Sequence, residues 1–481
     1  MKERFRLSTF VHPWFLAGVY TTSLSGASRE HRLPRGMFSR SPTVAALSGN
    51  AIQGNFGAEA KQRKNFMTMR TSQWFSLRGA CSGAALWLLL VITSHAQVRV
   101  VAIGDVHGAC PEFSAILQRT GLMDANRQWA GASAILVQTG DILDRGPRSR
   151  ECLDLLMQLE RQAERRHGKV VPLLGNHEVM NIMGDLRYVS DAEYRSFATD
   201  QSGKTRERIY QDYLKFLAAH RDHPHPAVPI DEAGRRKWVA EHPPGFFEYR
   251  DAIGPDGKYG RWLRKHHAIV QVADGLFVHG GLNPKLEFRS IAELDDRMRG
   301  ELNEFDSIWQ SLSGKQVIWR YMRLEEAVRQ VIEELSWIKA RGQIDDPEAV
   351  QQMQSLLGFE SWMIVSSQGP LWYRGLGLDP EESLAADLSA LLARLKVRYL
   401  VAGHTPQPKF SITVHFDNRV FLIDTGMLKE FFGGRPSALE IRNGRFTAFY
   451  LDGEPQLLAA PEGGDTAPRA TPKSGDGVNW R

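Results

Sequence analysis

Five short segments rich in Asp, His and Asn recur along the middle of this 481-residue chain, each with its own glycine. Each follows an apolar, β-rich run, which is the pattern of a buried strand that ends at a turn. Polar residues at successive strand ends gather at one edge of a sheet, where ligands usually bind. The segments are residues 104–108 (GDVHG), 140–146 (GDILDRG), 175–178 (GNHE), 278–281 (VHGG) and 403–406 (GHTP).

Strand-like and helix-like stretches alternate around these segments. The predicted strands are residues 98–103, 134–139, 170–174, 268–272, 276–278 and 399–402, and the predicted helices are residues 111–119, 149–166 and 383–395. This alternation predicts an α/β (α+β) fold in which mixed sheet is covered by helices. Residues 191–265 and 290–359 contain helical patterns, at 206–220 and 324–339, but no such polar segment. We expect them to be helical insertions that wall a cleft.

The net charge of +5 does not indicate a nucleic-acid partner. Residues 1–96 hold twelve Lys or Arg against three Glu, so the rest of the chain carries a net charge of about −4. Binding of a polyanion needs a basic surface on the folded part of the protein. We therefore predict no nucleic-acid binding.

Residues 67–96 resemble a secretory signal peptide. Arg70 and Arg78 lie around its basic start, residues 79–93 are mostly apolar, and small residues end at Ala96. This apolar run is shorter than the ~20 residues that span a bilayer, so cleavage after Ala96 is favoured over an uncleaved anchor. We expect a periplasmic or secreted protein without a stable membrane anchor after cleavage. Residues 1–66 are interpreted as disordered or as an over-extended start, with a genuine basic tail as the alternative.

Residues 461–481 are rich in Gly, Pro, Ala, Ser and Thr without periodicity, and we expect a disordered tail. Cys81 leaves with the signal peptide, so two cysteines remain, Cys110 and Cys152. A disulfide between them is chemically permitted outside the cytoplasm. Two buried thiols are the favoured interpretation.

The polar segments contain ligands for two metal ions. Asp105 and His107 are two positions apart, so on an extended strand end their side chains project to the same side and can bind one ion together. Asp141 offers a carboxylate that can bridge to a second ion. The remaining predicted ligands are Asn176, His279 and His404. Imidazole and carboxylate together suit Zn, Fe or Mn.

Three residues of the same segments are left for catalysis. His177 can protonate a departing alcohol, Asp144 can orient its ring, and Arg145 can grip phosphate oxygens. Two ions that share a bridging hydroxide favour in-line displacement at phosphorus. Any one of these motifs alone is more often a turn or a helix cap. The five together, in this order, indicate a dinuclear phosphoester hydrolase.

In these motifs the chain resembles the calcineurin-like metallophosphoesterase superfamily, and within it the phosphoprotein phosphatase branch. The series GDxHG, GDxxDRG, GNHE, HGG and a late His occurs in family order between residues 98 and 425. The resemblance implies a central β-sandwich flanked by helices, formed here by residues 97–460 with helical insertions. The intact Asp144 to Gly146 segment and Glu178 favour this branch over the diadenosine-tetraphosphate hydrolases.

The end of the motif series narrows the resemblance. Residues 423–427 (IDTGM) stand where the eukaryotic Ser/Thr enzymes carry SAPNYC, whereas residues 369–375 (GPLWYRG) and 402–406 (AGHTP) resemble the bacterial Shewanella-like phosphatases. This resemblance implies that Arg374 is a second arginine that grips phosphate. The alternative for an isolated Trp-Tyr-Arg is a packed aromatic edge.

The expected function is hydrolysis of phosphomonoesters by direct attack of a metal-bridging hydroxide, with two ions of Mn, Fe or Zn. The expected partner is a phosphorylated protein (Ser/Thr or Tyr), a peptide or a small phosphomonoester. Two alternatives stay open. One is a nucleotide or dinucleoside-polyphosphate hydrolase, or a phosphodiesterase, that uses the same metal centre. The other is a non-catalytic binding module, which retention of His177 and Arg145 disfavours.

Overall fold

The computed structural model describes residues 98–220 and 231–461, all within one compact unit of the chain, Ala96–Arg481. The predicted signal peptide, the segment before it and residues 462–481 of the predicted tail lie outside the described residues. Among the helices in the described ranges, none is both long and apolar enough to cross a membrane.

Six strands form the first sheet, in the order β11-β10-β9-β1-β2-β3. β1, β2 and β3 are parallel, and β9, β10 and β11 are antiparallel to their neighbours. Parallel strands end at the same edge of a sheet, so the chain leaves β1, β2 and β3 at one place. The bounds are β1 (Val100–Ile103), β2 (Ile135–Gln138), β3 (Lys169–Pro172), β9 (Ser437–Arg442), β10 (Arg445–Tyr450) and β11 (Gln456–Ala459).

Five strands form the second sheet, in the order β4-β5-β6-β8-β7. β5, β6 and β8 are parallel, while the outer strands β4 and β7 run antiparallel to their neighbours. The carboxyl ends of β5 and β6 therefore lie side by side, where residues 278–281 and 403–406 follow. The bounds are β4 (Ile269–Val272), β5 (Gly275–Val278), β6 (Tyr399–Ala402), β7 (Thr413–His415) and β8 (Val420–Leu422).

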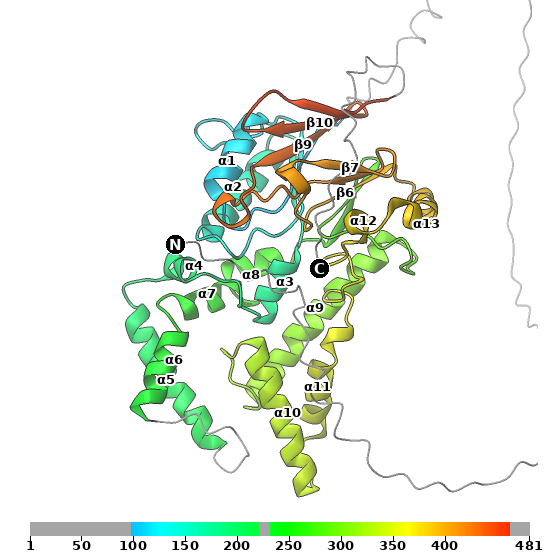
Figure 1. The fold of residues 1–481 in the computed structure, drawn as a ribbon. Coiled ribbons are helices and arrows are strands. Elements are labelled where there is room, and N and C mark those ends of the chain that lie inside the picture. The colour runs from blue at the N-terminus through cyan, green and yellow to red at the C-terminus, as the bar shows by residue number, and fades with distance from the viewer. Residues whose placement is uncertain (1–97, 221–230, 462–481) are drawn as a thin grey trace, which may run out of the picture. The chain divides into compact units, whose positions relative to one another are not determined.

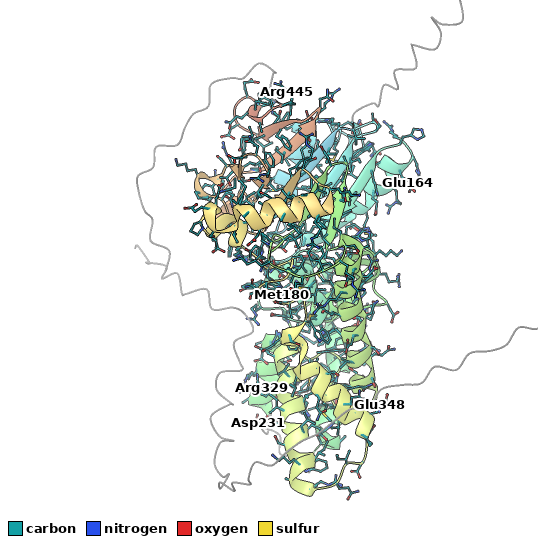
Figure 2. All side chains as sticks on the ribbon, turned by 90° about the vertical axis from the view of Figure 1, so that its right-hand side faces the viewer. Glu164, Met180, Asp231, Arg329, Glu348 and Arg445 are labelled. Carbon is teal, nitrogen blue, oxygen red and sulfur yellow. The ribbon has the colours of Figure 1, made fainter. Side chains whose placement is uncertain are left out.

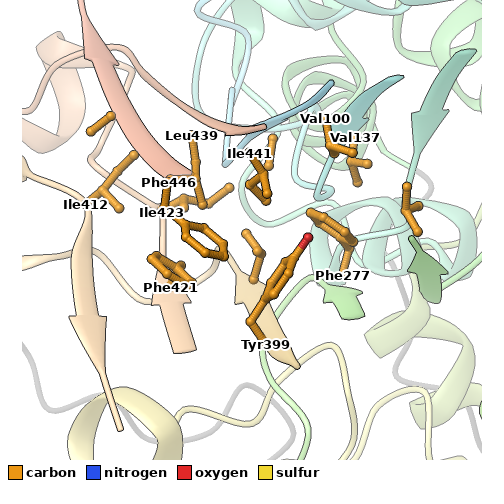
Figure 3. Packing of buried hydrophobic residues seen from close by; sticks show 14 of the residues in the cluster. Val100, Val137, Phe277, Tyr399, Ile412, Phe421, Ile423, Leu439, Ile441 and Phe446 are labelled. Carbon is orange, nitrogen blue, oxygen red and sulfur yellow. The ribbon is translucent and has the colours of Figure 1, made fainter. Parts of the chain in front are cut away.

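The two sheets pack against each other around one hydrophobic core (Figure 3). Phe421 of the second sheet stacks on Phe446 of the first, with ring centroids 4.2 Å apart. Tyr399 meets Phe446 edge-on at 4.9 Å, and Phe277 is fully buried beside them. Burial of such aromatic side chains is the main stabilising contribution to a sandwich of this kind. The predicted α/β fold with a central β-sandwich is confirmed.

Helices cover the faces of the two sheets that point away from the core between them (Figure 1). α1 (Cys110–Arg119) contacts β10, and α2 (Ser149–Glu164) contacts β3. α13 (Glu381–Leu395) is joined to the second sheet because Glu381 accepts a 2.7 Å hydrogen bond from the backbone N–H of Phe416. Cys110, which begins α1, and Cys152, which lies on α2, are both buried and form no disulfide.

The two predicted insertions are helical, and a short helix links them to the sheets. α3 (Asn176–Met183) begins at the GNHE segment and contacts α9. In Figure 2, Met180 of α3 lies between Arg445 of the first sheet and Arg329 and Glu348 of the second insertion. The insertion helices are α4 (Asp191–Phe197), α5 (Ser202–Ala219), α6 (Glu232–Glu241), α7 (Phe246–Ile253), α8 (Lys258–Leu263), α9 (Ile291–Gly314), α10 (Leu324–Arg341) and α11 (Pro347–Leu357).

Hydrogen-bonding side chains define where several of these helices begin. Ser190, Ser290 and Asp346 each accept a hydrogen bond from a backbone N–H in the first turn of the helix that follows. Such caps satisfy donors that a helix start leaves unpaired. Four smaller elements complete the secondary structure of residues 98–220 and 231–461: α12 (Gly375–Leu378), α14 (Lys429–Phe432) and the 3₁₀ turns Phe359–Ser361 and Pro408–Phe410.

β7 and β8 are not among the predicted elements, and neither are the three strands β9 to β11. The sequence nevertheless contains a signal for β9 to β11, because Asn443 and Gly444 stand between alternating apolar residues. Both have positive φ, 57° and 70°, as a two-residue hairpin turn requires. This hairpin supplies Leu439, Ile441 and Phe446 to the core between the sheets.

Loss of one core ring should destabilise the whole sandwich. We expect Phe421→Ala to lower the free energy of unfolding by about 3–5 kcal/mol, because it leaves a cavity beside Phe446. Leu378→Ala, at a side chain that is 67% exposed, is the control and should change it by less than about 0.5 kcal/mol. Denaturant unfolding measures both, and equal effects would contradict this description of the core.

Candidate metal centre

The polar segments converge where parallel strands of both sheets end. Asp105 and His107 follow β1, Asp141 follows β2, and His279 and His404 follow β5 and β6. Asn176 opens α3 just after β3. The two sheets are joined directly at this edge, since the His404 N–H after β6 donates to Asp105 Oδ1 after β1. Within the second sheet, the Gly403 N–H donates to His279 O.

Asp141 lies at the centre of the cluster. Its Oδ2 atom is 3.6 Å from His107 Nε2, 3.9 Å from His177 Nε2 and 3.3 Å from His279 Nε2. Two groups of side chains have their donor atoms within 4.8 Å of one another, and Asp141 belongs to both. The groups are His107, Asp141 and His177, and Asp141, His279 and His404. A carboxylate shared in this way is suited to bridge two ions.

The other predicted ligands stand around these groups. Asp105 Oδ2 is 3.9 Å from His107 Nε2. Asn176 Oδ1 is 2.8 Å and His404 Nδ1 is 3.1 Å from His279 Nε2. The structure therefore brings all six together. His177 is an addition to the first group, since the sequence predicts a role for it in catalysis rather than in metal binding.

The approach of Asp105 to His107 has a different origin from the predicted one. We expected an extended strand end to project both side chains to one side. Instead β1 ends at Ile103, and the backbone turns at His107, where φ is 47°. The two side chains meet because of this turn.

The histidine rings are oriented by backbone carbonyls. His107 Nδ1 donates to Leu143 O at 2.9 Å, and His279 Nδ1 donates to Thr139 O at 2.9 Å. Each bond directs the other ring nitrogen, Nε2, into the cluster as a lone-pair donor. His404 Nε2 is buried and has no hydrogen-bond partner among the described residues. His404 Nε2 fits a site for metal ions, because only a cation or a further donor would satisfy it.

The electrostatics of His107 and His404 also favour metal binding. Burial lowers the pKa of His107 well below its usual value, and the nearby charge of His177 lowers it further. Burial, followed by Arg374, lowers the pKa of His404 in the same way. Both rings are therefore neutral at neutral pH, which is the form of imidazole that binds a metal ion.

Carboxylates set the charge of the rest of the cluster. Burial raises the pKa of Asp105, and the neighbouring Asp424 raises it further. Burial acts to lower the pKa of His279, but Asp141 outweighs it and raises this pKa to about 9. Burial acts to raise the pKa of Asp141, but His279 and His177 outweigh it and hold this pKa well below its usual value. The carboxylates thus attract positive charge, which a metal cation would supply.

His177 and Asp144 form a close pair beside the cluster. His177 Nδ1 donates to Asp144 Oδ2 at 2.5 Å, and both side chains are buried. On the other side of the ring, Arg145 Nη2 is 3.2 Å from His177 Nε2. Arg145 Nε is buried without a partner among the described residues.

Arg374 lies by His404. Its Nη1 donates to His404 O at 2.6 Å, and burial lowers its pKa, although Asp424 and Asp105 oppose this shift. All ten predicted site residues are thus at or beside one cluster, with one arginine near His177 and the other near His404.

The backbone is strained at this cluster. Five of the predicted site residues have positive φ, which is uncommon for residues other than glycine. They are His107 (47°), Asp141 (58°), Asp144 (72°), Arg145 (68°) and His404 (65°). Two glycines allow close approach as well, because a Cβ on Gly175 or Gly403 would overlap the carboxylate of Asp141 or Asp105. Strain of this kind collects at functional sites.

Glu178 is a structural residue of the site whose contacts the sequence did not reveal. Its buried carboxylate accepts backbone N–H groups from Asp141, Ile142 and Leu143 at 2.7, 2.8 and 3.1 Å, and from Gly175 at 2.8 Å. These bonds fix the Asp141 loop to the start of α3. The sequence signal for this structural role is the position of Glu178 directly after Asn176 and His177.

An aromatic rim surrounds Arg145 and was not predicted. The rings of Tyr188, Phe431 and Phe432 lie 5.2, 4.8 and 5.1 Å from its guanidinium carbon. Tyr188 also contacts the His177 ring at 5.2 Å, and Phe431 is 58% exposed. We call these three residues the aromatic rim. Phe431 and Phe432 belong to the four-residue helix α14, which is too short to be recognised from periodicity.

Comparison with known proteins identifies the family. Residues 98–408, more than half of the chain, match the calcineurin-like phosphoesterase family. The chain belongs to this family. Its members use a dinuclear metal centre, with which the two Asp141-centred groups agree.

Curated relatives carry the names that the motif series led us to expect. The chain is 34% identical over 217 residues to Shewanella-like protein phosphatase 2 of Arabidopsis thaliana, which covers 43% of this chain and 52% of that protein. It is 24% identical over 332 residues to Shewanella-like protein phosphatase 1 of Plasmodium berghei, covering 68% and 67%. The matched region thus spans about half the length of the first relative. The predicted resemblance to Shewanella-like phosphatases is confirmed.

Among solved structures, the chain is similar to the cold-active protein-tyrosine phosphatase of a psychrophilic Shewanella species. The TM-score is 0.47 and the identity 24%, over 75% of this chain and 80% of that one.

Replacement of Glu178 should loosen the metal centre without touching a ligand. We expect Glu178→Gln to lower the free energy of unfolding by about 1–3 kcal/mol, since the amide cannot accept all of these N–H groups. Metal affinity should fall about 10- to 100-fold because Asp141 loses its support.

Thermal unfolding and metal titration measure the two effects. Glu304→Gln, at an exposed site on α9, is the matched control and should change neither. If Glu178→Gln bound metal as tightly as the parent protein, Glu178 would not support Asp141.

Proposed function

We propose that this protein is a metal-dependent phosphatase that hydrolyses phosphomonoesters, with phosphorylated proteins as its substrates. The observation that carries this proposal is the arrangement around Asp141. Two groups of metal-binding side chains share this carboxylate, and the His177–Asp144 pair and Arg145 stand beside it. Membership of the calcineurin-like phosphoesterase family supports the same conclusion.

Six residues would hold two ions, for which we propose Mn, Fe or Zn because the donors combine imidazole, carboxylate and amide oxygen. Bound ions would supply Lewis-acid stabilisation of the phosphoryl group and lower the pKa of water. The proposed ligands are Asp105, His107, Asp141, Asn176, His279 and His404.

His177 is proposed as the general acid for the departing alcohol. Asp144 holds the Nδ1–H, so Nε2 faces Arg145 and the cluster. A proton on Nε2 can pass to the leaving oxygen, and Asp144 stabilises the charge of the protonated ring. Water takes the phosphoryl group directly in this proposal, without a phosphoenzyme.

The two arginines are proposed to hold the phosphoryl oxygens. Arg145 Nε lacks an acceptor among the described residues, and a phosphoryl oxygen would provide one. Arg374 approaches from the His404 side, so the two guanidinium groups can bind different oxygens of one phosphoryl group.

The aromatic rim supports a preference for aryl phosphates, and therefore for phosphotyrosine over phosphoserine. Tyr188 contacts the proposed acid His177, and Phe431 and Phe432 lie against Arg145. A leaving group that accepts a proton from His177 is therefore released beside aromatic rings, which a phenol contacts more extensively than a serine side chain does.

A substrate panel at matched Mn concentration tests the proposed activity. We expect kcat/KM for a phosphotyrosine peptide to exceed that for a phosphoserine peptide by about tenfold or more, because each added apolar contact discriminates by a comparable factor. Diadenosine tetraphosphate and a phosphodiester should be turned over more slowly than either peptide. Preferred cleavage of these last two would favour the nucleotide or phosphodiester alternative. Absence of turnover with Mn, Fe or Zn would favour a binding module.

Substitution of His177 separates its proposed role as acid from a role as metal ligand. We expect His177→Asn to lower kcat by about 100- to 10,000-fold while metal content is unchanged. His279→Ala should lose bound metal, and His415→Asn, on the edge strand β7, should change neither quantity. Loss of metal from His177→Asn would make His177 a ligand instead.

We also propose that the protein is exported to the periplasm or secreted. The support is the sequence of residues 67–96 alone. N-terminal sequencing of the exported protein should begin at Gln97 or a near neighbour. A start before residue 67, or a protein that stays inside the cell, would contradict the proposed signal peptide.

A further inference from the structure

We propose that Asn181 and Tyr249 are positioning residues for the His177–Asp144 pair, and that Tyr249 makes the first helical insertion part of the catalytic apparatus. This inference rests on the proposed role of His177 as general acid. Neither residue belongs to the five polar segments, and neither is a proposed metal ligand.

A continuous chain of hydrogen bonds runs from Tyr249 to His177. The Tyr249 hydroxyl donates to Asn181 Oδ1 at 2.6 Å, and Asn181 Nδ2 donates to Asp144 Oδ1 at 2.9 Å. Asp144 Oδ2 in turn accepts from His177 Nδ1 at 2.5 Å. All four side chains are buried, with at most 3% of any of these residues exposed. Water therefore has little access to replace any of these bonds.

The chemistry of the Asn181 amide fixes its orientation. Its second N–H donates to His177 O at 2.8 Å, one turn earlier on α3. With the amide turned over, Oδ1 would face the carbonyl oxygen of His177 and the carboxylate of Asp144, which are both acceptors. Asn181 therefore uses both N–H groups and its carbonyl oxygen, and it can hold Asp144 in only one way.

Asp144 depends on this bond because its two oxygens have different partners. Oδ2 accepts from His177, and among the described residues Asn181 is the side chain that donates to Oδ1. The Asp144 backbone is itself strained, with φ of 72°. Without Asn181 the carboxylate can rotate, and the His177 ring then loses the contact that directs Nε2 at the leaving group.

Tyr249 is held in place by the insertion rather than by the sandwich. It lies on α7 (Figure 1), and its ring meets those of Tyr194 and Phe197 on α4 edge-on, at 5.4 and 5.0 Å. The position of its hydroxyl group is thus set by packing between α4 and α7. Packing in the first insertion is thereby coupled to His177, the proposed general acid, through the side-chain amide of Asn181.

The leaving group provides a test that a general loss of stability cannot imitate. Protonation by His177 matters for phenyl phosphate, because phenolate is a poor leaving group. It hardly matters for dinitrophenyl phosphate, because dinitrophenolate leaves without a proton. We expect Asn181→Leu and Tyr249→Phe to lower kcat for phenyl phosphate about tenfold, as loss of a supporting residue typically does, and for dinitrophenyl phosphate less than about twofold. The assays use the full chain loaded with Mn.

Tyr194→Phe is the matched control for Tyr249→Phe. It removes a hydroxyl from a buried residue of the same aromatic cluster, and this hydroxyl does not belong to the hydrogen-bond chain. It should leave kcat unchanged for both substrates. Tyr249→Phe keeps the ring and hence the packing, so it remains a test if Asn181→Leu fails to fold, and thermal unfolding reports which variants are folded.

His177→Asn, measured on the same two substrates, separates the two proposals. If it loses activity selectively on phenyl phosphate while the Tyr249 and Asn181 variants lose activity equally on both substrates or not at all, the positioning role is wrong and the acid role stands. If His177→Asn itself shows no selectivity, the acid role fails and the positioning role with it.

Discussion

The buried carboxylate of Glu178 accepts four backbone N–H groups, three from residues 141–143 and one from Gly175. These bonds attach the loop after β2 to the first turn of α3, so two segments that are distant in sequence behave as one rigid unit. The loop carries Asp141, Asp144 and Arg145, and the helix carries Asn176 and His177. Charge-assisted bonds to a buried carboxylate are strong and leave little freedom.

That rigid unit explains how strained backbone is tolerated at the centre. Asp141, Asp144 and Arg145 all have positive φ, which costs conformational energy at each position. The hydrogen bonds of Glu178 on one side and the packing of the sandwich core on the other offset this conformational energy. The result is a carboxylate, Asp141 Oδ2, that three imidazoles approach within 3.9 Å.

Much of the fold and the cluster could be predicted, because both rest on local pattern. The strands before each polar segment are apolar and β-rich, and the parallel strands β5 and β6 bring His279 and His404 together although they are far apart in sequence. Contacts without a local signature could not be predicted. Tyr249 reaches Asn181 across 68 positions and from another helix, and α14 brings Phe431 to Arg145 on only four residues.

Metal content of the purified protein and of Asp141→Asn tests the central claim most directly. If Asp141 is shared by two ions, the parent protein reconstituted with Mn should hold about two ions per chain, and the variant should fall below about one, since both groups lose a carboxylate. Elemental analysis after removal of unbound metal gives both numbers. A parent protein that holds no metal, or a variant that keeps both ions, would contradict the account.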